Sequence, residues 1–93
     1  MDKIKLYKVR KKLDNLDLKI LALIKKRTNL VNQVVKIKRF KKQIVDKARI
    51  NKVLINIKKN SIKKKIDPKI TKKIWVSMIR SYIEYEKRSF KKK

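Results

Sequence analysis

The feature that most constrains the fold is an apolar seam with heptad spacing between Leu6 and Ile37. Alternating steps of three and four residues meet an aliphatic side chain at every position but one. The seam consists of Leu6, Val9, Leu13, Leu16, Ile20, Leu23, Arg27, Leu30, Val34 and Ile37. This spacing is typical of a helix that packs against another helix along its length. Because no Gly or Pro interrupts it, we expect one helix from about Lys5 to Phe40.

The length of this helix predicts self-association. A helix of about 35 residues runs about 50 Å, whereas a compact monomer of this size has a radius of gyration of about 12 Å. The remaining residues of one chain cannot cover such a rod. We therefore expect an all-α homodimer in which the long helices of two copies cover each other. With 93 residues, the chain is expected to form a single domain over residues 1–93.

Two shorter helices are expected in the second half of the chain. We expect a break at Arg39–Gln43, an extended connector at Ile44 and Val45, and a helix over Lys47–Lys59 capped by Asp46. Its apolar residues have helical spacing: Ile50, Val53, Leu54 and Ile57. Asn60–Ile66 is interpreted as a lysine-rich linker. Asp67-Pro68 is a strong start signal for a third helix that reaches at least Glu86, and nothing in the chain predicts a strand.

The residue types that are missing limit the chemistry. There is no Cys and no His, which excludes disulfides, thiolate metal sites and histidine acid–base catalysis. We expect no metal and no cofactor. No apolar run is long enough to span a bilayer, and no signal-peptide pattern is present. These features favour a soluble cytoplasmic protein with no membrane association.

The formal charge of +25 raises the alternative of nucleic-acid binding. Two observations argue against it as the main function. Lysine far outnumbers arginine, although arginine is the residue that proteins mostly use to recognise bases and phosphates. The basic residues are also spread over every segment, without interleaved aromatic residues for base stacking. The positive field would still attract a small anionic substrate.

Several charged residues occupy positions where an apolar residue or an anion is expected. Arg27 lies on the seam, where a guanidinium is costly unless an anion meets it. Lys38 follows eleven residues later and projects from nearly the same face, about 16 Å along the helix. Arg49 lies in the first turn of the second helix, against the helix dipole. Glu86 continues the apolar face of the third helix, so its carboxyl is expected to carry a proton or to meet a cation.

In combination these residues resemble the all-helical (type II) chorismate mutases. Arg10, the block Leu13-Asp14-Asn15-Leu16-Asp17, Arg27, Leu30-Val31, Val34 and Lys38 are similar to the family's first helix. Val45-Asp46 followed by Arg49 resembles the entry to its second helix. Asp67-Pro68 and the stretch from Ile74-Trp75 to Glu86 resemble the third. The resemblance covers nearly the whole chain, and its specificity lies in the combination of basic residues and the final acid.

The resemblance implies an intertwined homodimer with two equivalent active sites that rearrange chorismate to prephenate in phenylalanine and tyrosine biosynthesis. Each site would take Arg27, Lys38, Arg49 and Glu86 from one subunit and Arg10 from the other. By analogy, Arg10 and Arg27 bind the two substrate carboxylates, and Lys38 and a protonated Glu86 stabilise the ether oxygen. Asp46 either accepts from the substrate hydroxyl or holds Arg49 in place. Tyr82 completes the expected substrate-binding set.

The chain departs from the family pattern in several places. Position 86 is Glu where Gln is frequent and works without a proton, and the loop around Lys41 to Ile44 lacks the usual Gly and Pro. Two further departures bear on the reaction. Ile50 follows Arg49 where many members have Glu, and Tyr82 stands where a small Ser is common. Both features also occur in the related isochorismate pyruvate lyases, which eliminate pyruvate from isochorismate on the same fold. The mutase is the favoured interpretation, because Asp46 and the segment Ile83-Glu84-Tyr85-Glu86 are more similar to the mutases. The lyase stays the alternative.

Overall fold

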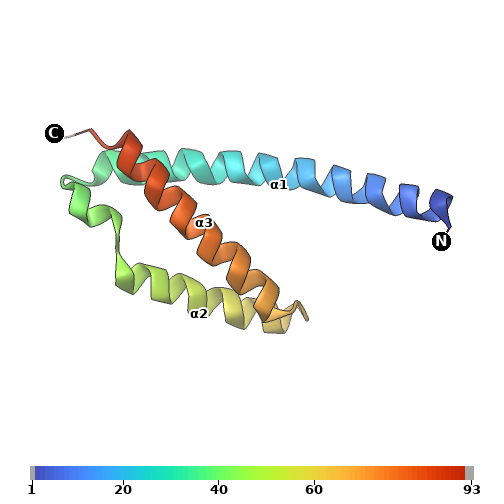
Figure 1. The fold of residues 1–93 in the computed structure, drawn as a ribbon. Coiled ribbons are helices and arrows are strands. Elements are labelled where there is room, and N and C mark those ends of the chain that lie inside the picture. The colour runs from blue at the N-terminus through green and yellow to red at the C-terminus, as the bar shows by residue number, and fades with distance from the viewer. Residues whose placement is uncertain (1, 92–93) are drawn as a thin grey trace. The chain divides into compact units, whose positions relative to one another are not determined.

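A computed structural model describes residues 2–91 of the chain, and within them every regular element is a helix (Figure 1). The elements are α1 (Lys3–Ile37), the 3₁₀ helix η1 (Lys41–Ile44), α2 (Lys47–Lys63) and α3 (Pro68–Ser89). The predicted all-α class with one very long and two shorter helices is confirmed. The chain divides into two compact units, residues 1–32 and 33–93, with the boundary inside α1.

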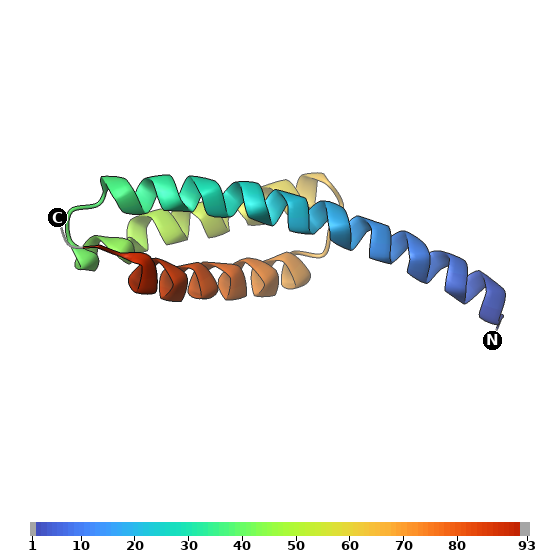
Figure 2. The same cartoon turned by 90° about the horizontal axis from the view of Figure 1, so that it is seen from above.

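Helix α1 is 35 residues long and unbroken (Figure 2). Asp2 caps its start, since its Oδ1 accepts hydrogen bonds of 3.0 Å from the amides of both Ile4 and Lys5. The helix ends three residues before the predicted Phe40. There the Oε1 atom of Gln43 accepts from the amides of Arg39 and Phe40, at 2.9 and 3.0 Å. A side-chain acceptor thus ends the helix where no Gly or Pro is available.

The segment between α1 and α2 differs in part from the expected connector. Ile44 ends the 3₁₀ helix and is 4% exposed, so the prediction of extended backbone at this residue is wrong. Val45 is extended as predicted, with φ −90° and ψ 102°. Asp46 is the N-cap of α2, as predicted, and its Oδ1 accepts from the amide of Arg49 at 3.0 Å.

Helix α2 continues to Lys63, so the predicted linker over Asn60–Ile66 is wrong for its first four residues. A Schellman motif ends the helix: the amide of Ile66 donates to the Ser61 carbonyl at 2.8 Å, and that of Lys65 to the Ile62 carbonyl at 3.1 Å. Lys65 takes the left-handed position, with φ 58°. Glycine usually fills this position, and its absence from the sequence concealed the helix end.

Helix α3 begins where the sequence predicted. Asp67 accepts from the amide of Lys69 at 2.9 Å, and Pro68 occupies the first turn. In Figure 1, α2 and α3 meet at the turn between them and spread apart toward the start of α2 and the end of α3. Both helices pack against each other, and α3 also contacts η1.

The apolar core of the single chain is very small. Among residues 2–91, Val35 and Ile44 are the buried apolar side chains, and Ser61, Thr71 and Glu86 are the buried polar ones. The seam of α1 is largely exposed: Leu13, Leu23 and Leu30 expose 54%, 63% and 61% of their surface. No helix within the described part of the chain is long and apolar enough to cross a membrane.

Candidate active site

Five of the seven predicted site residues lie in the unit formed by residues 33–93. They are Lys38, Asp46, Arg49, Tyr82 and Glu86, which lie just after α1, at the start of α2 and on α3, while η1 contributes none. The other two, Arg10 and Arg27, lie on α1 in the unit formed by residues 1–32.

Lys38 follows the last residue of α1 and is half-buried. Its amide still donates to the Val34 carbonyl at 3.1 Å, so its backbone continues the helical path. Its Nζ lies 3.5 Å from the carbonyl oxygen of Ile44, a long hydrogen bond that directs the ammonium group toward η1. Because Ile44 is itself buried, the Lys38 side chain is held by a carbonyl of a well-packed residue.

Asp46 and Arg49 form the first turn of α2. The carboxylate of Asp46 accepts from the backbone amide of Arg49, while the guanidinium of Arg49 belongs to an exposed residue. The cap satisfies one of the free amides at the start of the helix and offsets part of the dipole that opposes a cation there. An exposed, fork-shaped cation on a capped turn is suited to bind a carboxylate.

Glu86 and Tyr82 lie one turn apart on α3. Glu86 is 8% exposed, as expected for a residue that continues the apolar face of the helix. A carboxyl with so little access to water requires a proton or a favourable partner, and Glu86 does have an interaction partner within the chain. Tyr82 is half-buried, and its ring meets that of Tyr85 edge-on, with centroids 6.3 Å apart and an interplanar angle of 87°.

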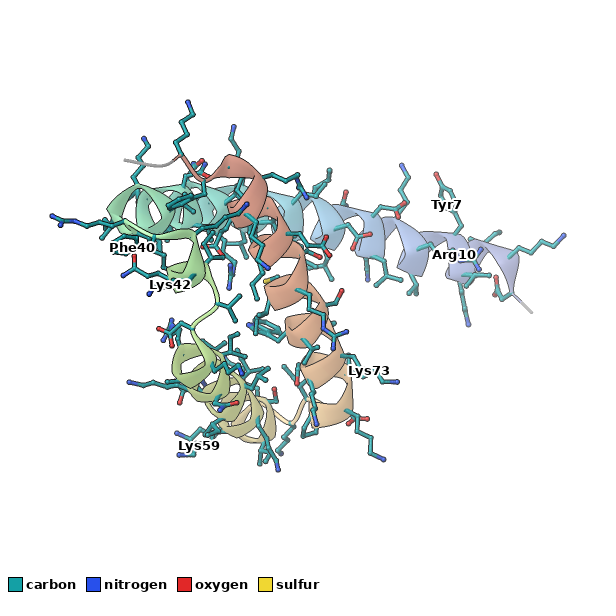
Figure 3. All side chains as sticks on the ribbon, turned by 60° about the vertical axis from the view of Figure 1, so that its left-hand side comes forward. Tyr7, Arg10, Phe40, Lys42, Lys59 and Lys73 are labelled. Atoms are coloured by element: carbon teal, nitrogen blue, oxygen red, sulfur yellow. The ribbon has the colours of Figure 1, made fainter. Side chains whose placement is uncertain are left out.

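Arg10 and Arg27 differ in their surroundings on α1. Arg10 is exposed on the N-terminal stretch that also carries Tyr7 (Figure 3). Arg27 is half-buried and has an interaction partner within the chain. Its neighbours on the seam, Leu23 and Leu30, are both more than half exposed. The arginine therefore lies on an apolar surface that one chain leaves open.

A groove between α2 and α3 lies apart from these residues. It has a volume of about 550 Å³ and is lined by Asn51, Leu54, Ile55, Ile57, Lys58, Pro68, Lys69, Thr71 and Lys72. None of the seven predicted site residues lines it. Residues 2–91 also contain no group of three or more acidic, histidine or cysteine side chains that could hold a metal ion. The charged residues, rather than this groove, define the candidate site.

Sequence reasoning did not single out three residues that shape this unit. Gln43 ends α1, and its signal was available as a Gln three residues after Phe40, the spacing of a capping box. Ser61 and Thr71 hydrogen-bond to each other between α2 and α3. No local pattern identifies that pair, because the two hydroxyls meet only after the helices have packed.

Comparison with known proteins identifies the class. The family model described as chorismate mutase type II matches residues 9–87. All seven predicted site residues fall within this range. The protein therefore belongs to the chorismate mutase type II family, and its three-helix, all-α structure is consistent with that family.

The family's type of activity is that of a chorismate mutase, which is an isomerase acting on chorismate. No curated protein and no solved structure matched the chain.

Proposed function

We propose that the protein is a chorismate mutase that rearranges chorismate to prephenate, the step that leads toward phenylalanine and tyrosine. The observation that carries the proposal is the family match over residues 9–87, which contains every predicted site residue. Three of those residues are also supported by their surroundings. Lys38 is directed toward η1, Arg49 presents an exposed guanidinium on a capped turn, and Glu86 is buried on α3.

The proposed mechanism needs no nucleophile. Chorismate is a dianion, and arginine forks from Arg27 and from the partner's Arg10 hold its two carboxylates so that the reacting carbons face each other. The ether oxygen gathers negative charge as its bond breaks. Lys38 stabilises that charge as a cation, and Glu86 stabilises it as a protonated donor. Asp46 either accepts from the substrate hydroxyl or holds Arg49 in place, and Arg49 and Tyr82 complete the substrate-binding set.

The proposal requires a homodimer, because Arg10 is supplied across the interface. The exposed seam of α1 supports this requirement. With Val35 and Ile44 as the buried apolar side chains of residues 2–91, one chain alone has little to stabilise it. A second copy that covers the seam would add the missing apolar burial. We place the enzyme in the cytoplasm, as a catalyst of aromatic amino acid biosynthesis.

The alternative function is isochorismate pyruvate lyase. It is favoured by Ile50, which stands where many family members have an acid, and by Tyr82, which stands where a small Ser is common. Both enzymes use a dianionic substrate of nearly the same shape, so the same arginines serve either reaction. We favour the mutase because Asp46 and the segment around Glu84 to Glu86 are more similar to the mutases.

A paired assay of the purified protein tests the proposal. Chorismate and isochorismate are supplied separately, and prephenate and pyruvate are measured. The mutase proposal predicts loss of chorismate with formation of prephenate at the higher kcat/KM. Faster release of pyruvate from isochorismate would overturn the mutase proposal in favour of isochorismate pyruvate lyase. Absence of turnover with both substrates would leave only the family fold and would overturn the function.

The variant Arg27→Ala tests whether this arginine binds substrate. We expect kcat/KM to fall by about 10²–10³-fold, since the loss of a charge-matched donor in a water-excluded site has this size. The dimer should persist in sedimentation analysis. Arg80→Ala, which removes an exposed arginine from α3, is the matched control and should retain full activity. A variant of Arg27 that dissociates, yet keeps its activity per folded dimer, would assign this arginine a structural role instead.

A further inference from the structure

We propose that the hydroxyl pair Ser61–Thr71 is a positioning lock for the active site. It fixes the angle between α2 and α3, and so the separation between Arg49 on one helix and Glu86 on the other. The proposal rests on the function proposed above, because it concerns the placement of two residues of that site. Ser61 and Thr71 would not touch substrate.

The hydrogen bonds of the pair form a directed chain. Ser61 Oγ lies 2.8 Å from Thr71 Oγ1 and 2.6 Å from its own helix carbonyl at Ile57, while Thr71 Oγ1 lies 3.3 Å from the Pro68 carbonyl. Each hydroxyl has one proton, so the two residues cannot donate in all three contacts at once. The short distance to Ile57 and the long one to Pro68 favour one order: Thr71 donates to Ser61, and Ser61 donates to Ile57.

The Ser61–Thr71 pair is buried, so breaking its hydrogen bond is costly. Ser61 is 4% exposed and Thr71 is 8% exposed. Water cannot easily replace a partner at that depth, so separating the hydroxyls would leave at least one polar group unsatisfied. Ser61 is also the only buried residue of α2. The deepest contact between the helices is therefore a hydrogen bond, which has a fixed length and direction, rather than an apolar contact that can slide.

Because the pair lies close to the turn between α2 and α3, it can set how far apart the other ends of these two helices lie. In Figure 1 the helices meet at their turn and spread apart from it, and Ser61 lies next to that turn. Its carbonyl also accepts from Ile66 in the Schellman motif, so the same residue holds the turn and the helix contact. Arg49 is about 18 Å from Ser61 along α2, and Glu86 is about 22 Å from Thr71 along α3.

A small rotation at the pair is therefore magnified at the site. Over an arm of about 20 Å, a change of about 5° moves the end by about 2 Å. A misplacement of about 1 Å is enough to lower a reaction rate by about 10²-fold when catalysis depends on holding the substrate in one geometry. Since the proposed reaction has no nucleophile and depends on such positioning, the lock would affect turnover without any contact with substrate.

Two variants remove the lock and two controls preserve it. Thr71→Val keeps the shape of the side chain but loses the donor, and Ser61→Ala removes the acceptor. Thr71→Ser retains the hydroxyl. Ser81→Ala removes a hydroxyl from α3 that bonds only within its own helix, to the Ser77 carbonyl at 2.9 Å. The two controls should behave like the parent protein.

The separation of the helix ends is measured directly. The chain has no cysteine, so Lys47→Cys and Lys87→Cys, both at exposed positions, introduce a unique pair of spin labels near the start of α2 and the end of α3. Labelled chains are mixed with an excess of unlabelled chains, so that pulsed dipolar spectroscopy records distances within one chain. We expect one narrow distance distribution in the parent and both controls, and a shifted or broadened one in Thr71→Val and Ser61→Ala.

Turnover is measured in parallel on the unlabelled variants. We expect kcat for chorismate to fall by about 10- to 100-fold in Thr71→Val and Ser61→Ala, while their helix content stays unchanged. In Thr71→Ser we expect kcat to stay at the parental value. A lowered melting temperature with unchanged kcat and unchanged distances would overturn the proposal. Failure of both variants to fold, while both controls fold, would also overturn it. If the parent turns over neither substrate, the proposed function fails, and the distances alone decide whether the lock exists.

Discussion

At the residue scale, the informative side chains are charged groups on apolar faces. Arg27 interrupts a seam of aliphatic residues, and Glu86 is 8% exposed on a helix whose last turn is basic. Such placements are costly for folding alone. In the proposed mechanism both residues have a function: Arg27 binds a substrate carboxylate, and protonated Glu86 donates a hydrogen bond to the ether oxygen.

The pH dependence of Glu86→Gln follows from that role. A protonated donor is present below the pKa of Glu86 and is lost as the pH rises through it, so kcat/KM of the parent should fall toward alkaline pH. The amide of Gln donates at every pH, so the variant should show a flatter profile. Glu84→Gln, at an exposed position two residues away, should keep the parental profile. An identical decline in the parent and in Glu86→Gln would exclude Glu86 as the donor.

At the element scale, capping carboxylates define where the helices begin. Asp2, Asp46 and Asp67 each accept from backbone amides at the starts of α1, α2 and α3. These are three of only seven acidic residues in the chain. An acid at a helix start satisfies free amides and also interacts favourably with the helix dipole. In a chain so rich in lysine, three of the seven acids therefore mark helix starts, while the other four lie inside α1 and α3.

We expect Asp67→Ala to destabilise the protein by about 1 kcal/mol, because α3 loses the acceptor for the amide of Lys69. Asp67→Asn retains an acceptor and should lose much less. Chemical denaturation at one fixed protein concentration gives the comparison, since the stability of an oligomer depends on concentration. Equal stability of Asp67→Ala and the parent would mean that Pro68 and the α2–α3 contacts alone fix the start of α3.

At the scale of the whole molecule, the exposed seam of α1 is the dominant feature. Its aliphatic side chains are more than half exposed over most of its length, while very few apolar side chains are buried elsewhere in residues 2–91. Burial of about 25 cal/mol per Å² of apolar surface is the main source of folding stability. Because one chain leaves its longest apolar surface exposed, we expect two copies to associate and bury this surface against each other.

Leu23→Glu tests the seam as the proposed dimer interface. A carboxylate at this position would have to be desolvated on association, so we expect dissociation and a loss of helix content at micromolar concentration. Lys25→Glu changes the charge more, but lies off the seam at an exposed position, and should leave the dimer intact. Sedimentation equilibrium provides the measurement. A dimer that tolerates Leu23→Glu as well as Lys25→Glu would place the interface elsewhere.

The sequence by itself determined the features that depend on near neighbours. Helix spacing, the absence of Gly and Pro, and Asp–amide caps act within a few residues, and they correctly predicted three helices and the starts at Asp46 and Asp67. The combination of Arg10, Arg27, Lys38, Arg49 and Glu86 carried the resemblance to the chorismate mutase type II family, and the family match over residues 9–87 confirms that resemblance.

Only the tertiary structure decided the features that depend on distant partners. Helix α2 extends past its predicted end because Ser61 finds Thr71 on another helix, and Glu86 is buried because of how α3 packs. Local composition at Asn60–Lys63 favoured a linker, but burial and a hydrogen bond outweighed that preference. Intrinsic helix propensities differ by less than about 1 kcal/mol per residue, whereas an unsatisfied buried polar group costs about 1–3 kcal/mol. The tertiary contact therefore favours a helix that includes Ser61, and the Schellman motif then ends it at Lys63.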